Sequence, residues 1–240
     1  GGLIMGYMID GTHAEYVRTP FADTSLYPLP ERLNEEVAVF LSDVLPTSHE
    51  IGVQYGNVKP GDTIAIISTG PIGMGCLLTA QFYSPAQIIA VDMDDNRLEF
   101  AKTVGATHIV NSGKEDAIQK ILEITDGRGV DCAIEAVGVE PTWNICQHVV
   151  KEGGHIANVG VHGKSVNFEL NKLWIKNLTI TTGLVNANTT GMLLKTCCSG
   201  KIPLEKLATH HFKFNEFEKA YDVFKHAADE KALKVMIDMN

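Results

Sequence analysis

The chain has 240 residues, of which 45% are hydrophobic and 20% are charged, a composition ordinary for a globular protein. Its formal net charge of −9 argues against nucleic acid as a partner, because proteins that bind a phosphate backbone present a basic surface. No apolar run approaches the ~20 residues that a membrane span requires, no signal-peptide pattern opens the chain, and the five cysteines form no C-x-x-C pair, so we expect reduced thiols in a cytoplasmic protein with no membrane partner.

Short apolar strands alternate with helical stretches along most of the chain. Ahead of this alternation, residues 11–17 predict a strand and residues 27–30 a proline-rich turn. The predicted strands, each followed where possible by its helix, are residues 63–67 with a helix to residue 83, 88–91 with 94–103, 108–110 with 114–125, 130–135 with 140–150, 155–159, and 178–181. A helix over residues 216–228 and a strand over 233–237 follow.

This alternation predicts the fold class. Strands separated by helices of 10–15 residues indicate βαβ units and a parallel sheet. The runs at 64–67 and 88–91 are continuously apolar, as expected for strands buried on both faces. Six such strands predict an α/β fold with a doubly wound, parallel six-stranded Rossmann sheet over residues 44–186. Residues 1–43 and 187–240 do not fit the repeat, and we expect them to be pieces of a second domain.

The strongest local motif follows the first of these strands. Ser68-Thr69-Gly70-Pro71-Ile72-Gly73 is close to G-x-G-x-x-G, with serine at the first glycine position. Gly70 lets the backbone approach a pyrophosphate, and Gly73 lets the next helix pack closely on the strand. The helix N-terminus then offers N–H groups and positive dipole to the phosphates. Serine weakens the match, because it cannot take every conformation open to glycine.

A carboxylate strengthens the cofactor prediction. Asp92 ends the next strand, 19 residues after Gly73, and an acidic residue near that spacing accepts hydrogen bonds from the adenosine ribose. It would repel a 2′-phosphate, so we predict NAD rather than NADP. Arg97 is also a candidate cofactor-binding residue, although its place inside the following helix favours a solvated position. Asp92 could alternatively be only a helix cap.

Later strand ends also leave room for a ligand. In open α/β sheets the ligand lies beyond the carboxyl ends of the strands, and small or apolar residues there would accommodate nicotinamide and its ribose. Taken singly, each of these glycines could equally be an ordinary loop residue. The candidates are Ala136, Val137, Gly138, Val159, Gly160, Val161, Gly183 and Leu184.

Several segments together resemble the medium-chain dehydrogenase/reductase superfamily. They are residues 11–17 (Gly-Thr-His-Ala-Glu-Tyr-Val), 41–47 (Leu-Ser-Asp-Val-Leu-Pro-Thr), 58–62 (Val-Lys-Pro-Gly-Asp), 69–73 and 153–156. The zinc-dependent alcohol dehydrogenases are the most similar group. The resemblance implies that residues 1–43 and 187–240 are remnants of a barrel-like, GroES-like catalytic domain, and that the chain is N-terminally truncated.

The resemblance also implies particular site residues. Asp43 matches the third ligand of the family's catalytic zinc, while the Cys and the His–Glu pair that complete that site have no counterpart here. One carboxylate cannot hold a catalytic zinc, which takes three protein ligands and an open position. His49-Glu50 is not that pair, because it follows Asp43. Lys234 falls where the family has a basic residue near the pyrophosphate, although an exposed strand lysine is an equal alternative.

The implied activity is NAD-dependent interconversion of an alcohol with an aldehyde or ketone, with zinc assisting hydride transfer in the intact enzyme. We expect this chain to be mainly the cofactor-binding part and inactive alone, with no catalytic residue retained. The resemblance also implies a homo-oligomer joined through the last strand of the sheet. Two alternatives are a zinc-free reductase resembling quinone reductases, against which Asp43 argues, and a non-catalytic NAD-binding or assembly fragment.

Overall fold

The computed structural model of the protein describes residues 4–239. These residues divide into two compact units, one of residues 43–185 and one of the residues up to 42 together with those from 186 onward. Within residues 4–239, every helix falls short of the length and apolar character that crossing a membrane takes.

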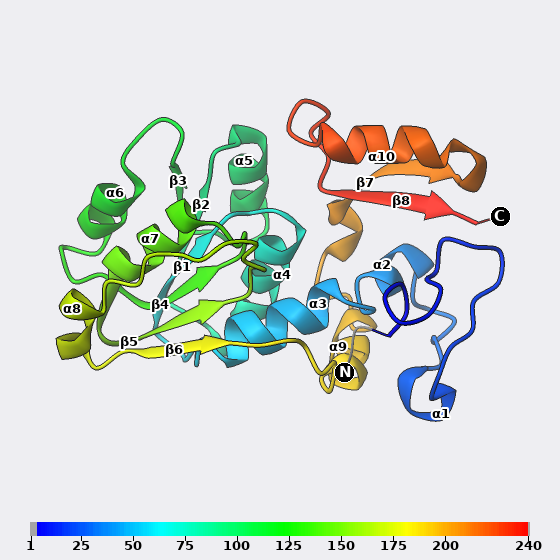
Figure 1. Cartoon of the computed structure of the whole chain (residues 1–240), viewed down its shortest axis with the longest axis horizontal. Coiled ribbons are helices and arrows are strands. Elements are labelled where there is room, and N and C mark those ends of the chain that lie inside the picture. Colours follow the sequence, from blue (N-terminus) through cyan, green and yellow to red (C-terminus); the bar gives the residue numbers. More distant parts are fainter. Residues whose placement is uncertain (1–3, 240) are drawn as a thin grey trace. The chain divides into compact units, whose positions relative to one another are not determined.

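The larger unit is built on a six-stranded sheet, and every pair of neighbouring strands in it is parallel (Figure 1). The strands are β1 (Thr63–Ile67), β2 (Gln87–Asp92), β3 (His108–Asn111), β4 (Val130–Glu135), β5 (Val150–Asn158) and β6 (Thr179–Thr182). Their order is β3-β2-β1-β4-β5-β6. The chain reverses its direction of travel across the sheet between β1 and β4, and ligands of doubly wound folds bind beside that reversal. The predicted fold class is thus confirmed for this unit.

Helices connect the strands and cover the sheet. They are α3 (Val44–Thr47), the π-helix η1 (Ser48–Gln54), α4 (Pro71–Ala80), η2 (Gln81–Tyr83), α5 (Asp95–Thr103), α6 (Ala117–Ile124), α7 (Glu140–Val149), α8 (Leu170–Leu173) and η3 (Trp174–Lys176). The starts of α5 and α6 are fixed by Asp94 and Asp116, whose side chains accept backbone N–H groups of the first turn.

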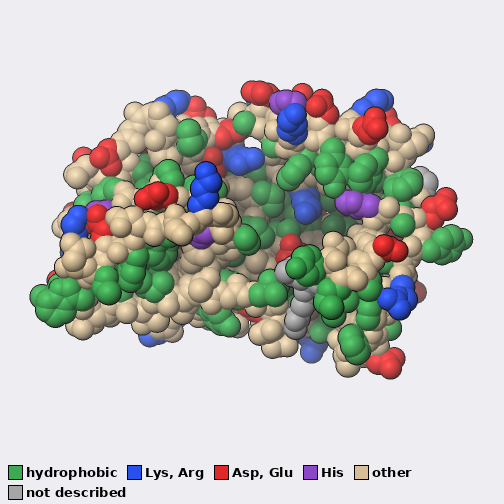
Figure 2. All heavy atoms as spheres, in the orientation of Figure 1, with side chains coloured by type: hydrophobic (Ala, Val, Ile, Leu, Met, Phe, Trp, Pro, Cys, Tyr) green, Lys and Arg blue, Asp and Glu red, His purple; other side chains and the backbone are tan. Residues whose placement is uncertain are grey.

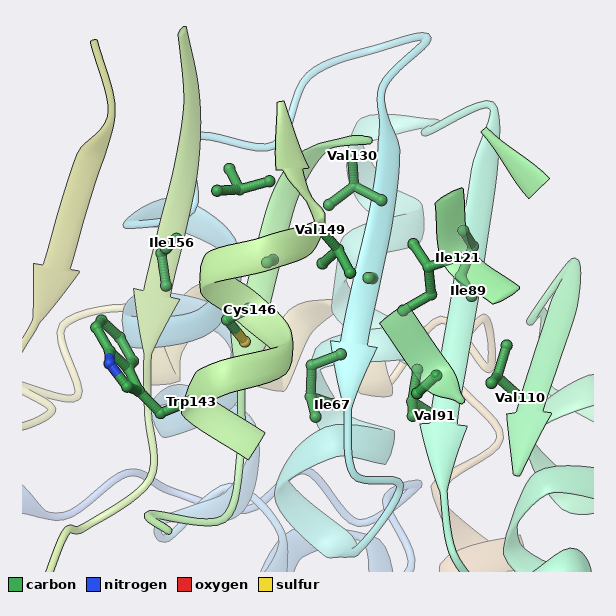
Figure 3. Packing of buried hydrophobic residues seen from close by; sticks show 14 residues of the cluster. Ile67, Ile89, Val91, Val110, Ile121, Val130, Trp143, Cys146, Val149 and Ile156 are labelled. Atoms are coloured by element: carbon green, nitrogen blue, oxygen red, sulfur yellow. The ribbon is translucent and has the colours of Figure 1, made fainter. Parts of the chain in front are cut away.

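One hydrophobic cluster of this unit lies between the sheet and helices α6 and α7. Ile121 of α6 and Trp143, Cys146 and Val149 of α7 are buried in one cluster with the strand residues (Figure 3). Ile67 of β1, for example, is 1% exposed. Burying apolar surface of this kind is the main contribution to folding, so the continuous apolar runs of the strands place them at the centre of the unit.

The π-helix η1 and the turn that follows it, residues 48–56, pack closely on α4 and β4 through two glycines. A Cβ atom on Gly52 would lie 2.5 Å from Sγ of Cys76, and one on Gly56 would lie 2.5 Å from Sγ of Cys132. Both thiols are completely enclosed or nearly so, at 0% and 1% exposure. Each sulfur therefore occupies space that any residue larger than glycine would need.

The other unit contains a short two-stranded parallel sheet of β7 (Ala208–Lys213) and β8 (Lys234–Asp238). Helix α10 (Phe217–Lys225) packs against both strands. The remaining elements are α1 (Ala22–Ser25), α2 (Glu35–Val39), α9 (Thr190–Cys197), η4 (Leu204–Leu207) and η5 (Phe214–Glu216).

Three sequence expectations need correction. Residues 11–17 form a series of bends rather than a strand, and the backbone of those residues makes no hydrogen bond to any described segment, so no ladder holds them extended. Strand β5 begins at Val150, and Gly153-Gly154 lie inside it rather than before it. Helix α6 begins at Ala117, later than the predicted residue 114, because the Asp116 side chain caps it there.

Candidate cofactor-binding site

A tight turn joins β1 to α4 and contains the glycine motif. Gly70 directly precedes the helix, and Pro71 occupies its first turn. A Cβ atom on Gly73 would lie 1.9 Å from the carbonyl oxygen of Ser68, so helix and strand can approach this closely only with glycine there. A Cβ on Gly70 would have no neighbour closer than 3.8 Å. The turn is therefore tight beneath the helix and open beside Gly70, where the N-terminus of α4 begins.

Ser68 takes a left-handed backbone conformation at the first position of the motif, with φ of 88°. This region costs a residue with a Cβ atom about 1–2 kcal/mol relative to its favoured conformations. Serine thus adopts here a conformation that glycine would adopt more easily. The side chain is half-buried, and its Oγ lies 3.3 Å from Oδ2 of Asp92.

The Asp92 carboxylate ties the end of β2 to the glycine turn. Its Oδ2 accepts the backbone N–H of Thr69 at 2.7 Å and the Thr69 hydroxyl at 3.0 Å, besides the Ser68 hydroxyl. Its Oδ1 accepts the backbone N–H groups of Met93 at 2.8 Å and Asp94 at 3.1 Å. Asp92 is therefore not the cap of α5, which is Asp94. It ties the end of β2 to the turn after β1 through the donors around its carboxylate.

Arg97 lies beside the same turn. A Cβ atom on Gly70 would lie 3.9 Å from its Nη1. Its Nε is buried and has no hydrogen-bond partner among the residues that the structure describes. Arg97 as a whole is half-buried, so its side chain is only partly in the solvated position expected on a helix face. A cation next to the N-terminus of α4 suits an anionic ligand.

The ends of β4 and β5 are joined through Glu135, which is 0% exposed. Its Oε1 accepts the N–H of Val137 at 3.0 Å, the N–H of Gly138 at 2.9 Å and the hydroxyl of Thr142 at 2.6 Å. A Cβ atom on Gly160 would lie 2.3 Å from Oε2 of the same carboxylate. The buried charge is stabilised by these donors, and it fixes the first loop against the second.

The remaining candidates lie at successive strand ends of the same sheet. Ala136 and Gly138 follow β4, Val159 and Gly160 follow β5, and Gly183 follows β6. Apolar side chains near them are exposed: Val137 by 43%, Val161 by 89% and Leu184 by 58%. Exposed apolar groups at the carboxyl ends of parallel strands are available to a ligand's apolar parts.

Lys234 and Asp43 do not belong to the strand ends of this sheet. Lys234 is half-buried at the start of β8, in the other unit. Asp43 is exposed, precedes α3 and accepts the Thr47 hydroxyl through Oδ1 at 2.7 Å. Among residues 4–239, no group of three or more His, Cys, Asp and Glu side chains could hold a metal ion. The described residues therefore do not fit a catalytic zinc, which needs three protein ligands.

Sequence reasoning missed the structural importance of Glu135 and His162. His162 Nε2 lies 2.8 Å from Oδ1 of Asn158 and 3.7 Å from Oε2 of Glu135, and Trp143 packs edge-on against the ring. The available signal was Glu135 itself, an acidic residue ending an otherwise buried strand. A charge at such a place is retained only when donors surround it.

Comparisons with known proteins agree with this geometry. A family profile described as zinc-binding dehydrogenase matches residues 71–195. An alcohol dehydrogenase of Cupriavidus necator is 34% identical over 98% of this chain, and the chain spans 65% of that relative's length.

Solved structures give the same result. The apo form of zinc dependent alcohol dehydrogenase 2 from Streptococcus pneumonia is 55% identical with a TM-score of 0.92, over 98% of this chain and 68% of that one. Alcohol dehydrogenase TADH from Thermus sp. ATN1 is 32% identical with a TM-score of 0.90, over 96% and 66%. With the parallel sheet, the glycine turn and these matches together, the chain belongs to the zinc-binding dehydrogenase family.

Proposed function

We propose that the chain binds NAD beyond the carboxyl ends of β1, β2, β4 and β5, as the cofactor-binding part of an oxidoreductase that interconverts an alcohol with an aldehyde or ketone. One observation carries the proposal: a tight glycine turn at the N-terminus of α4 is hydrogen-bonded to a carboxylate that ends the neighbouring strand. This arrangement offers backbone N–H groups for a pyrophosphate and an acceptor for ribose hydroxyls.

Different residues of the proposed site contact different parts of the cofactor. The pyrophosphate would lie against Gly70–Gly73, with Arg97 beside it, and the adenosine ribose would reach Asp92. The loops after β4, β5 and β6 would border the nicotinamide, and Lys234 would approach the pyrophosphate. Asp92 favours NAD over NADP, because a 2′-phosphate would meet a carboxylate. The cofactor carries the hydride chemistry, while the protein orients it.

Zinc-assisted alcohol chemistry requires more than the described residues provide. In this proposal Asp43 is one ligand of a zinc site whose other ligands come from outside residues 4–239. The chain by itself then binds NAD but oxidises little or no alcohol. The alternative is a non-catalytic NAD-binding fragment. It is favoured by the finding that residues 4–239 hold no group of three metal-ligating side chains.

We also propose that the chain forms a homo-oligomer through β6. This edge strand has no neighbour on one side in the described sheet, and Figure 2 shows hydrophobic side chains gathered over α8 and the segment that follows it. Trp174, Ile175 and Ile180 are 68%, 64% and 39% exposed. An unpaired strand edge flanked by apolar groups is a surface that another subunit covers.

The five free thiols fit a protein of the reducing cytoplasm, which is the location we propose.

Calorimetric titration of NAD+ into the 240-residue chain tests the cofactor site. We expect binding to the wild type and binding at least about tenfold weaker to Asp92→Asn, because a hydrogen bond to a charged acceptor is lost. NADP+ should bind more weakly than NAD+ to the wild type. Asp126→Asn is the matched control, since that side chain is 83% exposed at the end of α6. Equal NAD+ affinity of wild type and Asp92→Asn would refute the site.

Alcohol turnover is measured on the same preparation with added zinc. We expect less than one bound zinc per chain and no NADH formation from simple primary or secondary alcohols. NAD+ binding without turnover supports the fragment alternative for this chain. Zinc-dependent alcohol oxidation by these 240 residues would refute the proposed incompleteness of the site.

A further inference from the structure

Two polar groups of the proposed NAD site are held by a side chain of the protein itself. The Ser68 hydroxyl donates to Oδ2 of Asp92 at 3.3 Å and accepts the backbone N–H of Gly70 at 3.4 Å. In the proposed complex a ribose hydroxyl needs the first group and a phosphate oxygen needs the second. One side chain therefore occupies hydrogen-bonding positions from both halves of the adenosine diphosphate moiety.

The two hydrogen bonds of Ser68 are longer than those that Asp92 accepts from its other donors. Both are near the upper limit of hydrogen-bond length, whereas the Thr69 bonds to the same oxygen are 2.7 Å and 3.0 Å. Thr69 is 0% exposed, while Ser68 is half-buried. The Thr69 contacts hold the turn to β2, and the Ser68 hydroxyl is the more accessible of the two donors.

The backbone explains why this hydroxyl reaches the site. Ser68 stands at the first glycine position of the motif with φ of 88°. A glycine at this position would adopt the same backbone with no side chain over the turn. The Ser68 side chain makes two hydrogen bonds, and both go to groups of the proposed site.

We propose that Ser68 is an affinity-determining residue whose hydroxyl competes with the adenosine ribose and the pyrophosphate for Asp92 and Gly70. The inference rests on the proposed function, since it concerns the same NAD site. Without cofactor, Ser68 bridges the strand end and the turn. When NAD binds, the Ser68 hydroxyl gives up both partners and the cofactor's oxygens take them.

The test compares Ser68→Ala with the wild type by calorimetry, using NAD+ and ADP-ribose. Alanine keeps the Cβ atom and its backbone cost but removes the hydroxyl, so any change reports the competition. We expect both ligands to bind about threefold to tenfold more tightly to Ser68→Ala. The reason is that binding no longer has to break the two hydrogen bonds of the Ser68 hydroxyl. Ser68→Gly should show the same tightening.

Ser84 provides the matched control. It is an exposed serine with φ of 50° at the far end of α4 and η2, so Ser84→Ala and Ser84→Gly make the same changes away from the turn. Circular dichroism confirms that each variant is folded. Unchanged or weaker NAD+ binding by folded Ser68→Ala, with the wild type binding normally, would overturn this inference alone. Absence of NAD+ binding in all the folded chains would overturn the proposed site and the inference together.

Discussion

Glu135 and its donors illustrate what a single buried charge requires. The carboxylate is 0% exposed, and Glu135→Gln keeps its shape but replaces one acceptor oxygen by an NH₂ group facing the Gly138 N–H. We expect the free energy of unfolding to fall by about 1–3 kcal/mol, because hydrogen bonds to a charged acceptor are lost and donors face one another. Urea denaturation measures this. Glu140→Gln, an exposed change in the first turn of α7, should alter stability by less than about 0.5 kcal/mol.

His49 gives a prediction about pH. The His49 side chain is 1% exposed and contacts the rings of Phe82 and Tyr83. Neither of its ring nitrogens has a hydrogen-bond partner among the described residues. Burial lowers the pKa of His49 from its ordinary value of 6.5, against a smaller opposing effect of Glu50. The folded chain therefore keeps His49 neutral at pH values where the unfolded chain protonates it.

The direction of the pH dependence of stability follows from this difference in the pKa of His49 between the folded and the unfolded chain. Above about pH 6.5 both states are neutral at His49 and stability does not depend on it. Below that pH the unfolded state binds the proton first, so stability falls until the lowered folded pKa is reached. We expect His49→Phe to reduce the loss of urea stability between pH 7.5 and 5.5, and to add about 1 kcal/mol at pH 7.5 by removing unpaired polar atoms. A pH dependence identical in wild type and variant would contradict this.

At the scale of elements, the proposed oligomer makes a prediction about the unpaired edge of β6. Ile180 is 39% exposed on that strand, and in the proposed oligomer Ile180→Lys would bring like charges together across the subunit contact. We expect the dissociation constant of the oligomer to rise at least about tenfold, measured by sedimentation. Thr103→Lys, the same added charge at the exposed end of α5, should leave assembly unchanged. A wild-type chain that sediments as a monomer at high concentration would exclude contact through this edge.

The central strands β1, β2 and β4 could be predicted from the sequence because nearly all of their residues are buried. Residues 64–67 are an unbroken apolar run and all are at most 1% exposed. Residues 11–17 show the limit of the same reasoning. They have suitable residue types, but a strand also needs a neighbour to share hydrogen bonds, and a single sequence does not reveal whether one exists.

At the scale of the whole molecule, strand order depends on contacts between residues far apart in the sequence. The alternation predicted six parallel strands, and the structure adds that β1 and β4 are neighbours. That adjacency brings the ends of β1, β2, β4 and β5 to one edge of the sheet. The sequence motif could therefore indicate Gly70, Gly73 and Asp92 as candidates. It could not show that Asp92 already has five donors, or that Arg97 lies beside Gly70, because both depend on side-chain positions across separate elements.

The close packing of the Cys76 and Cys132 sulfur atoms against Gly52 and Gly56 affects the reactivity of both thiols. Burial raises the pKa of Cys76 to about 12 and raises that of Cys132 further, so almost no thiolate forms at neutral pH. Both sulfurs are packed against glycine backbone, so an alkylating reagent, or a single added oxygen atom, fits only after residues 48–56 have moved away from α4 and β4. The rate at which these two cysteines are alkylated therefore reports how often this local opening occurs. Half-buried Cys198 is the internal reference that reacts fast.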